Sequence, residues 1–155
     1  MLIDTAMLGQ IDVDEGDIFH LPEGLYGFES ESDYALITKQ DEDFTLMWFQ
    51  AVKAPAPCFV VFDPCDVVDD YTPKLDSSDL ASLGATGEDQ LSFLVIAVVP
   101  EDVSQISVNL KSPIALSRQN KTAKQVLLQN QDYPIKYYLF GQDGAAPECV
   151  PEGTC

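Results

Sequence analysis

Apolar residues in this chain come in short runs separated by turn-forming residues, and that spacing constrains the fold more than any other feature. Three runs are rich in β-branched and aromatic residues: Tyr34–Ile37, Thr45–Val52 and Phe59–Asp63. The segments between them, residues 40–43 and 54–57, are acidic or carry two prolines, and both compositions favour turns. Many short strands joined by such turns predict an all-β fold, a compact antiparallel β-barrel or sandwich.

Other segments extend the β pattern. The remaining strands are expected at Met1–Leu8 with Ile11–Val13, Leu91–Val99, Ile106–Leu110, Lys124–Gln129 and Ile135–Phe140. The first two would form a hairpin that turns at Gly9-Gln10. The run Leu91–Val99 is typical of a strand buried on both faces, whereas Ile106–Leu110 alternates apolar and polar residues like a half-buried strand.

One or two short helical inserts interrupt this pattern. Asp76 can cap a helix over Ser77–Leu83, and Asp79 lies three residues further on, as in a capping box. Gly84 follows, the residue type that most often ends a helix. A second helical turn is expected at Ser30–Asp33. The prediction is therefore a β domain with few and short helices.

The segment His20–Glu29, which reads H-L-P-E-G-L-Y-G-F-E, predicts a shaped turn rather than a flexible linker. Pro22 fixes its φ at about −65° and removes a hydrogen-bond donor. Gly24 and Gly27 allow backbone conformations that a Cβ would forbid. The apolar side chains around the two glycines would anchor the turn against a core.

This segment resembles F-P-E-G-I-P-G-F-E near the N-terminus of the flagellar assembly factor FliW family, with His20 in place of Phe and Tyr26 in place of the second Pro. Three more segments follow in the family's order: Phe59–Pro64, similar to its apolar strand ending in Asp-Pro; Val108–Ile114, similar to N-L-K-x-P-I; and Lys124–Leu128 with Tyr133–Ile135, similar to K-Q-V-x-L and Y-P-I. We call these the four family-like segments, and they cover residues 1 to about 136.

The resemblance implies a compact antiparallel β-barrel with short helical inserts. It also implies a function. FliW-like proteins bind the RNA-binding translational regulator CsrA and thereby relieve its repression of flagellin synthesis. They also bind flagellin, which competes for them in the cytoplasm. On this resemblance the chain would be a binding protein in flagellar assembly.

Charge points independently to a basic partner. Residues 1–100 carry 20 acidic and 3 basic residues, a net charge of −17, and residues 101–155 carry 6 and 5, a net charge of −1. Acidic surfaces keep proteins soluble, but so large and lopsided a charge costs stability through self-repulsion, which a basic partner relieves. Direct binding to nucleic acid or to an anionic membrane is disfavoured, because both need clustered Lys and Arg.

The first candidate for a partner-binding surface is the segment that follows the predicted strand Phe59–Asp63. It offers four carboxylates and one aromatic side chain: Asp63, Asp66, Asp69, Asp70 and Tyr71. The second candidate is Asn109 and Lys111, polar positions beside two expected core residues. The turn Pro22–Glu29 comes third, since its shape suggests architecture more than contact. The alternative is that these acids form an ordinary solvated loop.

Residues suited to catalysis are sparse. His20 is the single histidine, so every nucleophile–His–acid triad would pass through it, and its place in a turn favours a structural or exposed role. The sequence contains no Gly-rich phosphate loop, and Asp66, Asp69 and Asp70 lack the spacing of a calcium loop. We expect no enzyme activity, metal or cofactor. Two alternatives stay open: a small-ligand or divalent-cation-binding β-barrel enzyme, and a structural subunit that oligomerises through edge strands.

The expected organisation is one β domain over residues 1–140 and a flexible C-terminal tail over residues 141–155. The tail lacks apolar periodicity and contains Cys149 and Cys155, which we expect to be exposed. No basic, apolar leader is evident at Met1, and the longest apolar run, Phe93–Val99, is too short to span a bilayer. The expected location is the cytoplasm.

Overall fold

The computed structural model describes residues 1–6, 8–40, 42 and 45–140. The described strands are β1 (Leu2–Thr5), β2 (Gly9–Asp12), β3 (Ile18–His20), β4 (Asp33–Gln40), β5 (Thr45–Ala51), β6 (Cys58–Phe62), β7 (Ser92–Val98), β8 (Ser107–Val108), β9 (Ile114–Ser117), β10 (Thr122–Gln125) and β11 (Tyr137–Tyr138). The described helices are α1 (Ser77–Ser82) and the 3-10 helices η1 (Glu15–Asp17), η2 (Pro64–Asp66), η3 (Glu88–Gln90) and η4 (Val103–Gln105). The predicted tail, with Cys149 and Cys155, lies outside the described residues.

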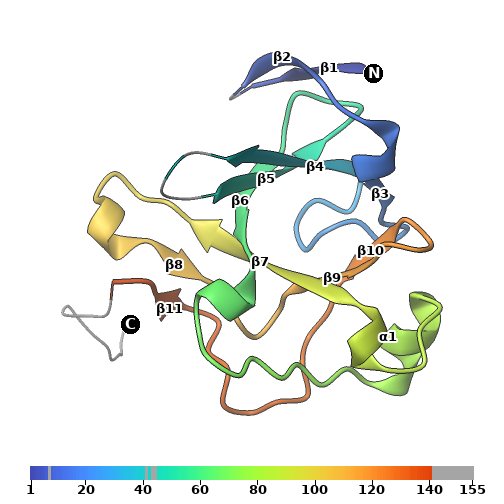
Figure 1. The fold of residues 1–155 in the computed structure, drawn as a ribbon, viewed down its shortest axis with the longest axis vertical. Helices are drawn as coiled ribbons and strands as arrows, with labels where there is room; N and C mark the ends of the chain where they lie inside the picture. The colour runs from blue at the N-terminus through green and yellow to red at the C-terminus, as the bar shows by residue number, and fades with distance from the viewer. Residues whose placement is uncertain (7, 41, 43–44, 141–155) are drawn as a thin grey trace.

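Seven of the described strands close into a barrel (Figure 1). Strands β3 to β7 form an antiparallel meander in which each strand pairs with its neighbours in the sequence. Strands β9 and β10 close the barrel, because β9 pairs with β7 and β10 pairs with β3. The β3–β10 pair, at His20 and Thr122, is parallel, while the other barrel pairs are antiparallel. The predicted all-β barrel with short helical inserts is confirmed.

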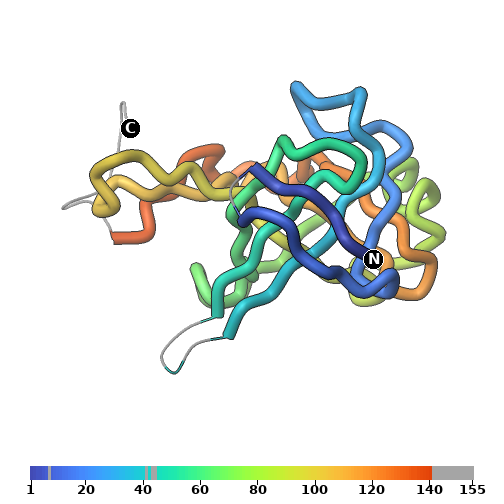
Figure 2. The backbone as a smooth tube through the Cα atoms, turned by 90° about the horizontal axis from the view of Figure 1, so that it is seen from above, coloured from blue at the N-terminus to red at the C-terminus, as the bar shows by residue number. Residues whose placement is uncertain are grey.

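Strand β7 belongs to two parts of the molecule. Its residues 92–94 pair with β9 and close the barrel, whereas Ala97 and Val98 pair with β8, which in turn pairs with β11. The end of β7, η4, β8 and β11 form an arm that extends from one side of the barrel (Figure 2). We call this part the arm.

Large apolar side chains fill the barrel. This cluster contains Phe19, Leu21, Leu25, Tyr34, Leu36, Phe49, Ala51, Val61, Leu94, Ile114, Leu116 and Ala123. The next residue after Leu94, Val95, belongs to a second cluster on the other face of the sheet, which includes Tyr71, Leu83 and Val108. The middle of β7 is therefore buried on both faces, as predicted, but its end is not, because Val98 is 60% exposed.

The opening hairpin is confirmed, but its predicted turn at Gly9-Gln10 is wrong. Both residues belong to β2, where Gly9 pairs with Thr5. The turn lies before Gly9, and Thr5 holds it: the hydroxyl donates to the Gly9 carbonyl (2.7 Å) and accepts from the Leu8 N–H (2.8 Å). Gly9 still serves the turn, because its φ of 72° is one that glycine adopts readily, but it does so as the first residue of β2.

Several other predictions need correction. The strand predicted at Ile106–Leu110 shrinks to β8, and its alternation is wrong, because Ser107 and Val108 are both buried. The strands predicted at Lys124–Gln129 and Ile135–Phe140 correspond to the shorter β10 and β11. The helical turn predicted at Ser30–Asp33 is wrong, because β4 already begins at its last residue. Strands β3 and β9 were not predicted.

Candidate functional site

The acidic loop, residues 63–70, follows β6 and is fixed at its start by Asp63. The carboxylate of Asp63 caps η2 by accepting the backbone N–H two residues further on at 2.9 Å, and Pro64, which is buried, stands in the first turn. Asp66, Asp69 and Asp70 are exposed. All four predicted carboxylates are therefore exposed, and one of them, Asp63, also holds the loop in shape.

Tyr71 ends the acidic loop inside the protein. It is only 8% exposed, its hydroxyl donates to the Leu110 carbonyl at 2.7 Å, and its ring centroid lies 4.7 Å from that of Tyr133. Burial raises the pKa of Tyr71 well above its ordinary value, which keeps the hydroxyl a donor. The predicted contact between this ring and a partner stays a prediction, and the structure first gives Tyr71 the role of attaching the loop to the barrel.

The same hydrogen bond joins the two predicted surfaces, because Leu110 lies between Asn109 and Lys111. The Asn109 side-chain oxygen accepts the N–H groups of Lys111 (3.1 Å) and Ser112 (2.9 Å) and so forms a local turn. The Lys111 ammonium donates to the Asn130 carbonyl. Asn109 and Lys111 are half-buried, and their polar groups are used mainly to hold this turn.

A groove of about 520 Å³ lies on the barrel beside the arm. Its lining includes residues from all four family-like segments: Leu25, Tyr26, Phe59, Val108, Asn109, Gln125 and Ile135. The rest of the lining includes Ile96 and Val98 from β7 and Lys136 beside β11. Segments that are scattered over the sequence therefore meet at one place. Of these lining residues, Asn109 belongs to the second predicted surface, and Leu25 and Tyr26 belong to the turn Pro22–Glu29, the third candidate.

Gln125 explains why the segments meet. Its side chain is buried at 7% exposure, its carbonyl accepts the Tyr26 N–H at 2.9 Å, and its amide donates to the Ser112 carbonyl at 3.2 Å. One amide thus ties the turn Pro22–Glu29, which we call the glycine turn, to the segment Val108–Ile114. On the other side of the turn, the Phe28 ring meets the Phe59 ring edge-on at 5.3 Å between centroids.

The glycine turn owes its shape to Gly24. Its φ is 67°, and a Cβ at this position would lie 2.7 Å from the Glu29 Cα and 2.8 Å from the Phe28 carbonyl oxygen. The chain therefore folds back on itself so closely that only glycine fits. The result is that Leu25 is buried at 1% exposure, while Tyr26 and Phe28 are exposed at 55% and 40%.

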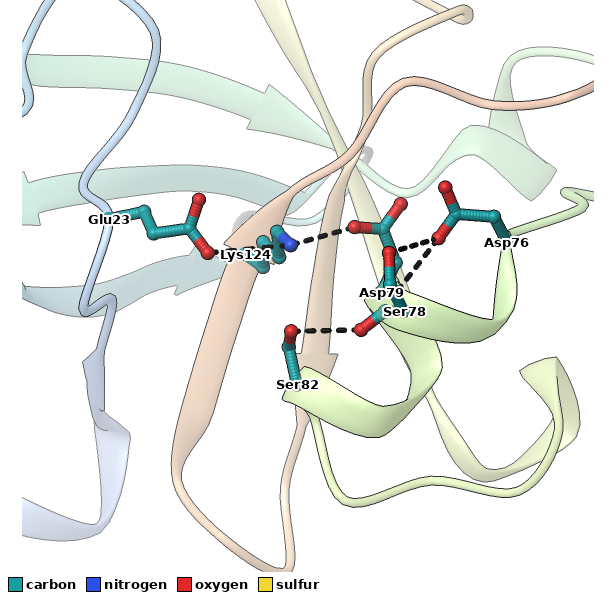
Figure 3. A network of polar contacts seen from close by, with 6 residues as sticks. All are labelled: Glu23, Asp76, Ser78, Asp79, Ser82 and Lys124. Atoms are coloured by element: carbon teal, nitrogen blue, oxygen red, sulfur yellow. Dashed lines mark hydrogen bonds and ion pairs between the residues drawn. The ribbon is translucent and has the colours of Figure 1, made fainter.

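A network around Lys124 fixes this turn from the side of α1 (Figure 3). Lys124 Nζ lies 2.7 Å from Asp79 Oδ1 and 3.4 Å from Glu23 Oε2, and the hydrogen bond to Asp79 is the main cause that raises the Lys124 pKa. Asp76 caps the helix by accepting the Asp79 N–H at 2.8 Å, so the predicted cap is confirmed. The second half of the predicted capping box differs, since the carboxylate of Asp79 pairs with Lys124.

His20 belongs to a small group of charged and polar side chains at the surface. Its Nδ1 lies 2.8 Å from Asp33 Oδ1, Lys53 Nζ lies 3.0 Å from Asp33 Oδ2, and the His20 side chain is 57% exposed. The hydrogen bond from His20 is the main cause that lowers the Asp33 pKa. Among the described residues no group of three or more His, Cys, Asp or Glu side chains is placed to hold a metal ion. The described helices are also too short or too polar to cross a membrane.

Known proteins resemble this chain in sequence and in fold. The profile of the FliW protein family matches residues 2–139. A flagellar assembly factor FliW from Ruminiclostridium cellulolyticum is 33% identical over 142 residues, which is 92% of this chain and 96% of the relative. One from a Geobacillus species is 35% identical over 140 residues, 90% of this chain and 96% of the relative. A crystal structure of the flagellar assembly factor FliW has a TM-score of 0.81 and 30% identity, and the match covers 93% of this chain and all of that one.

By its fold the described chain is a small closed β-barrel with short helical inserts, in which residues of the four family-like segments line one groove. The profile match and the relatives fix the family. The chain belongs to the FliW family of flagellar assembly factors.

Proposed function

We propose that this flagellar assembly factor works by binding and without catalysis. It binds the RNA-binding translational regulator CsrA, relieves the repression of flagellin synthesis, and also binds flagellin in the cytoplasm, where it acts as a chaperone in flagellum biogenesis. The observation that carries the proposal is the negative charge, −17 over residues 1–100, together with four exposed carboxylates on the acidic loop.

The acidic loop suits a basic, RNA-binding partner. A protein that binds RNA presents Lys and Arg, and exposed carboxylates on a rigid loop complement such a surface. Asp66, Asp69 and Asp70 would make the direct contacts. The remaining proposed residues, Asp63, Tyr71, Asn109 and Lys111, form the support of the loop and its neighbouring turn, so a partner would meet them as a preformed surface.

Binding of purified CsrA in a salt series tests the electrostatic account. Raising the ionic strength to a physiological level shortens the Debye length to about 8 Å. The association rate should fall steeply with salt, while the dissociation rate changes less. Association rates that stay flat across the series would contradict the proposal.

A charge-reversal pair locates the contact. Asp66→Lys with Asp69→Lys changes the net charge by the same amount as the control pair Glu15→Lys with Asp17→Lys in η1, which is also exposed. Asp70 is left in place because its φ is 54°, a conformation that Asp tolerates better than Lys. Only the loop pair should weaken CsrA binding by more than about 1 kcal/mol. Equal affinities of the two double variants would show that overall charge, and not this loop, decides binding.

A further inference from the structure

The groove between the glycine turn and the arm has a character opposite to that of the acidic loop. Three of its lining side chains, Tyr26, Val98 and Ile135, are 55%, 60% and 68% exposed. Phe28, which is 40% exposed, packs against the lining residue Phe59. Single exposed apolar side chains are ordinary on a protein surface, but several around one hollow mark an interaction site. The exposed surface here is apolar in a protein whose net charge is −18.

The charge of the lining limits the kind of partner that can bind in the groove. Lys136 is the one charged residue among the described residues that line the groove, and it is exposed, with its Nζ 5.8 Å from the centroid of the Tyr138 ring. In the part of the chain that the structure describes, the lining contains no carboxylate. A strongly basic surface therefore finds no counter-charge here, whereas an apolar segment that carries a carboxylate can fill the groove and pair with Lys136.

The strand edge beside the groove further limits the kind of partner that can bind. An extended peptide binds by adding to an open strand edge, and the edge strand next to this groove, β11, offers two residues, Tyr137 and Tyr138. The residues that line the groove come instead from the turn Pro22–Glu29, from strands of the barrel and from the arm. Side-chain grooves of this kind receive the apolar face of an amphipathic helix, which anchors residues one turn apart.

We propose that this groove is a second docking site, separate from the acidic loop, and that its occupant is an amphipathic helix of a partner protein with an apolar face and a carboxylate placed to meet Lys136. The inference deepens the proposed function and rests on it, because that function requires a second protein partner besides the basic regulator. The two partners would then bind through surfaces of different chemistry.

Two pairs of matched variants test the groove, with flagellin as the probe and CsrA as the reference. Val98→Glu places a carboxylate on the groove wall, and Val103→Glu makes the same change in η4, outside the groove, at a side chain that is also about 60% exposed. Lys136→Glu reverses the charge in the groove, and Lys39→Glu does so at an exposed lysine at the far end of β4.

The affinity of each variant for each protein is measured alongside its melting temperature. We expect Val98→Glu to weaken flagellin binding at least about tenfold and Lys136→Glu several-fold, with both control variants and CsrA binding close to wild type. Equal flagellin affinity of Val98→Glu and Val103→Glu overturns the groove as the site. Loss of CsrA binding in Val98→Glu alongside flagellin overturns the separation of the two sites.

Other outcomes are also decisive. Wild-type protein that binds CsrA but not flagellin overturns the inference and leaves the regulator part of the proposed function standing. Wild-type protein that binds neither overturns both. Sedimentation of the wild type and of Val98→Glu tests whether a second copy of this chain occupies the groove. A wild-type dimer that becomes a monomer in Val98→Glu would show that it does and would contradict the proposal.

Discussion

The acidic loop and the groove lie on one small barrel but are held in shape by different forces. The loop depends on two hydrogen bonds: a carboxylate caps η2 locally, and one tyrosine hydroxyl reaches Leu110, 39 residues further along the chain. The groove depends on packing between distant segments, for example the hydrogen bond from the Tyr26 N–H to Gln125, which are 99 residues apart. The difference teaches that changes in the loop should alter binding at little cost to stability, whereas changes in the groove's frame should alter both.

The largest expected effect separates two glycines of the same turn. Gly24→Ala should lower the free energy of unfolding by more than about 2 kcal/mol, because a positive φ and a backbone clash combine. Gly27→Ala should cost only about 1 kcal/mol, since φ is 85° but nothing lies within 4 Å of the added Cβ. Urea unfolding of both variants measures the gap. Equal losses would mean that the frame of the groove tolerates displacement and is not rigid.

Gln125 comes next. Gln125→Leu keeps the bulk but leaves the Tyr26 N–H and the Ser112 carbonyl without this partner, so we expect a loss of about 2 kcal/mol in the free energy of unfolding. Gln129→Leu, at an exposed position, is the control and should stay within about 0.5 kcal/mol of wild type. Amide hydrogen exchange at Tyr26 should rise only in the first variant. If it stays protected, another contact holds the turn.

On the loop side the expected effect is smaller. Tyr71→Phe removes the hydrogen bond to Leu110 but keeps the ring, at a cost of about 1 kcal/mol. Tyr137→Phe, at a half-buried position in β11, should change the free energy of unfolding by less than about 0.5 kcal/mol. Thermal melts of both proteins provide the test. A loss in Tyr71→Phe as large as that in Gly24→Ala would erase the contrast between the two regions.

The smallest expected effect is the pH dependence of stability that arises from the Asp76 cap of α1. Asp76 accepts the Asp79 N–H, the main cause that lowers its pKa below 3.8, and a side-chain hydrogen bond with Ser78 adds to it. Because the folded pKa is lowered, this stabilisation is present above pH 3.8 and is lost as the pH falls through the lowered pKa.

Asp76→Asn keeps a capping side chain that does not titrate. Unfolding of the wild type and of this variant, followed from about pH 5 to about pH 2, should show the wild type losing its advantage only at the acid end. Comparing two proteins with the same remaining acids cancels the general relief of self-repulsion. Parallel curves would show that the cap does not depend on the charge of Asp76.

Sequence patterns predicted the long elements and failed on the short ones. Strands β4 to β7 follow apolar runs with clear ends, so their positions agree within a few residues. Strand β9 escaped prediction because Ile114–Ser117 is buried throughout and shows neither alternation nor length. Strands β8 and β11 have two residues each, and pairing with strands outside these short segments defines them.

The same contrast holds for the candidate sites. The acidic loop could be located from the sequence because its carboxylates are adjacent and follow a strand. That Asp63 caps η2 and that Tyr71 is buried could not be predicted, since their partners are the N–H of Cys65 and the carbonyl of Leu110. The groove was invisible because no single segment builds it. The available signal was that the four family-like segments occur in the family's order. That order indicates that they belong to one fold, but it does not show that they meet in space.

The two pairings that close the barrel have a consequence for the newly made chain. Strands β3 to β7 need only the sequence up to Val98, whereas the closing partners, β9 and β10, end at Gln125. At about 5–20 residues per second, a ribosome takes a few seconds to supply them. During that interval the emerging meander carries unpaired edges at β3 and β7, and such edges attract strands from other chains. The time at which this protein is most prone to aggregate is therefore set by the translation of a short stretch in the last third of its message.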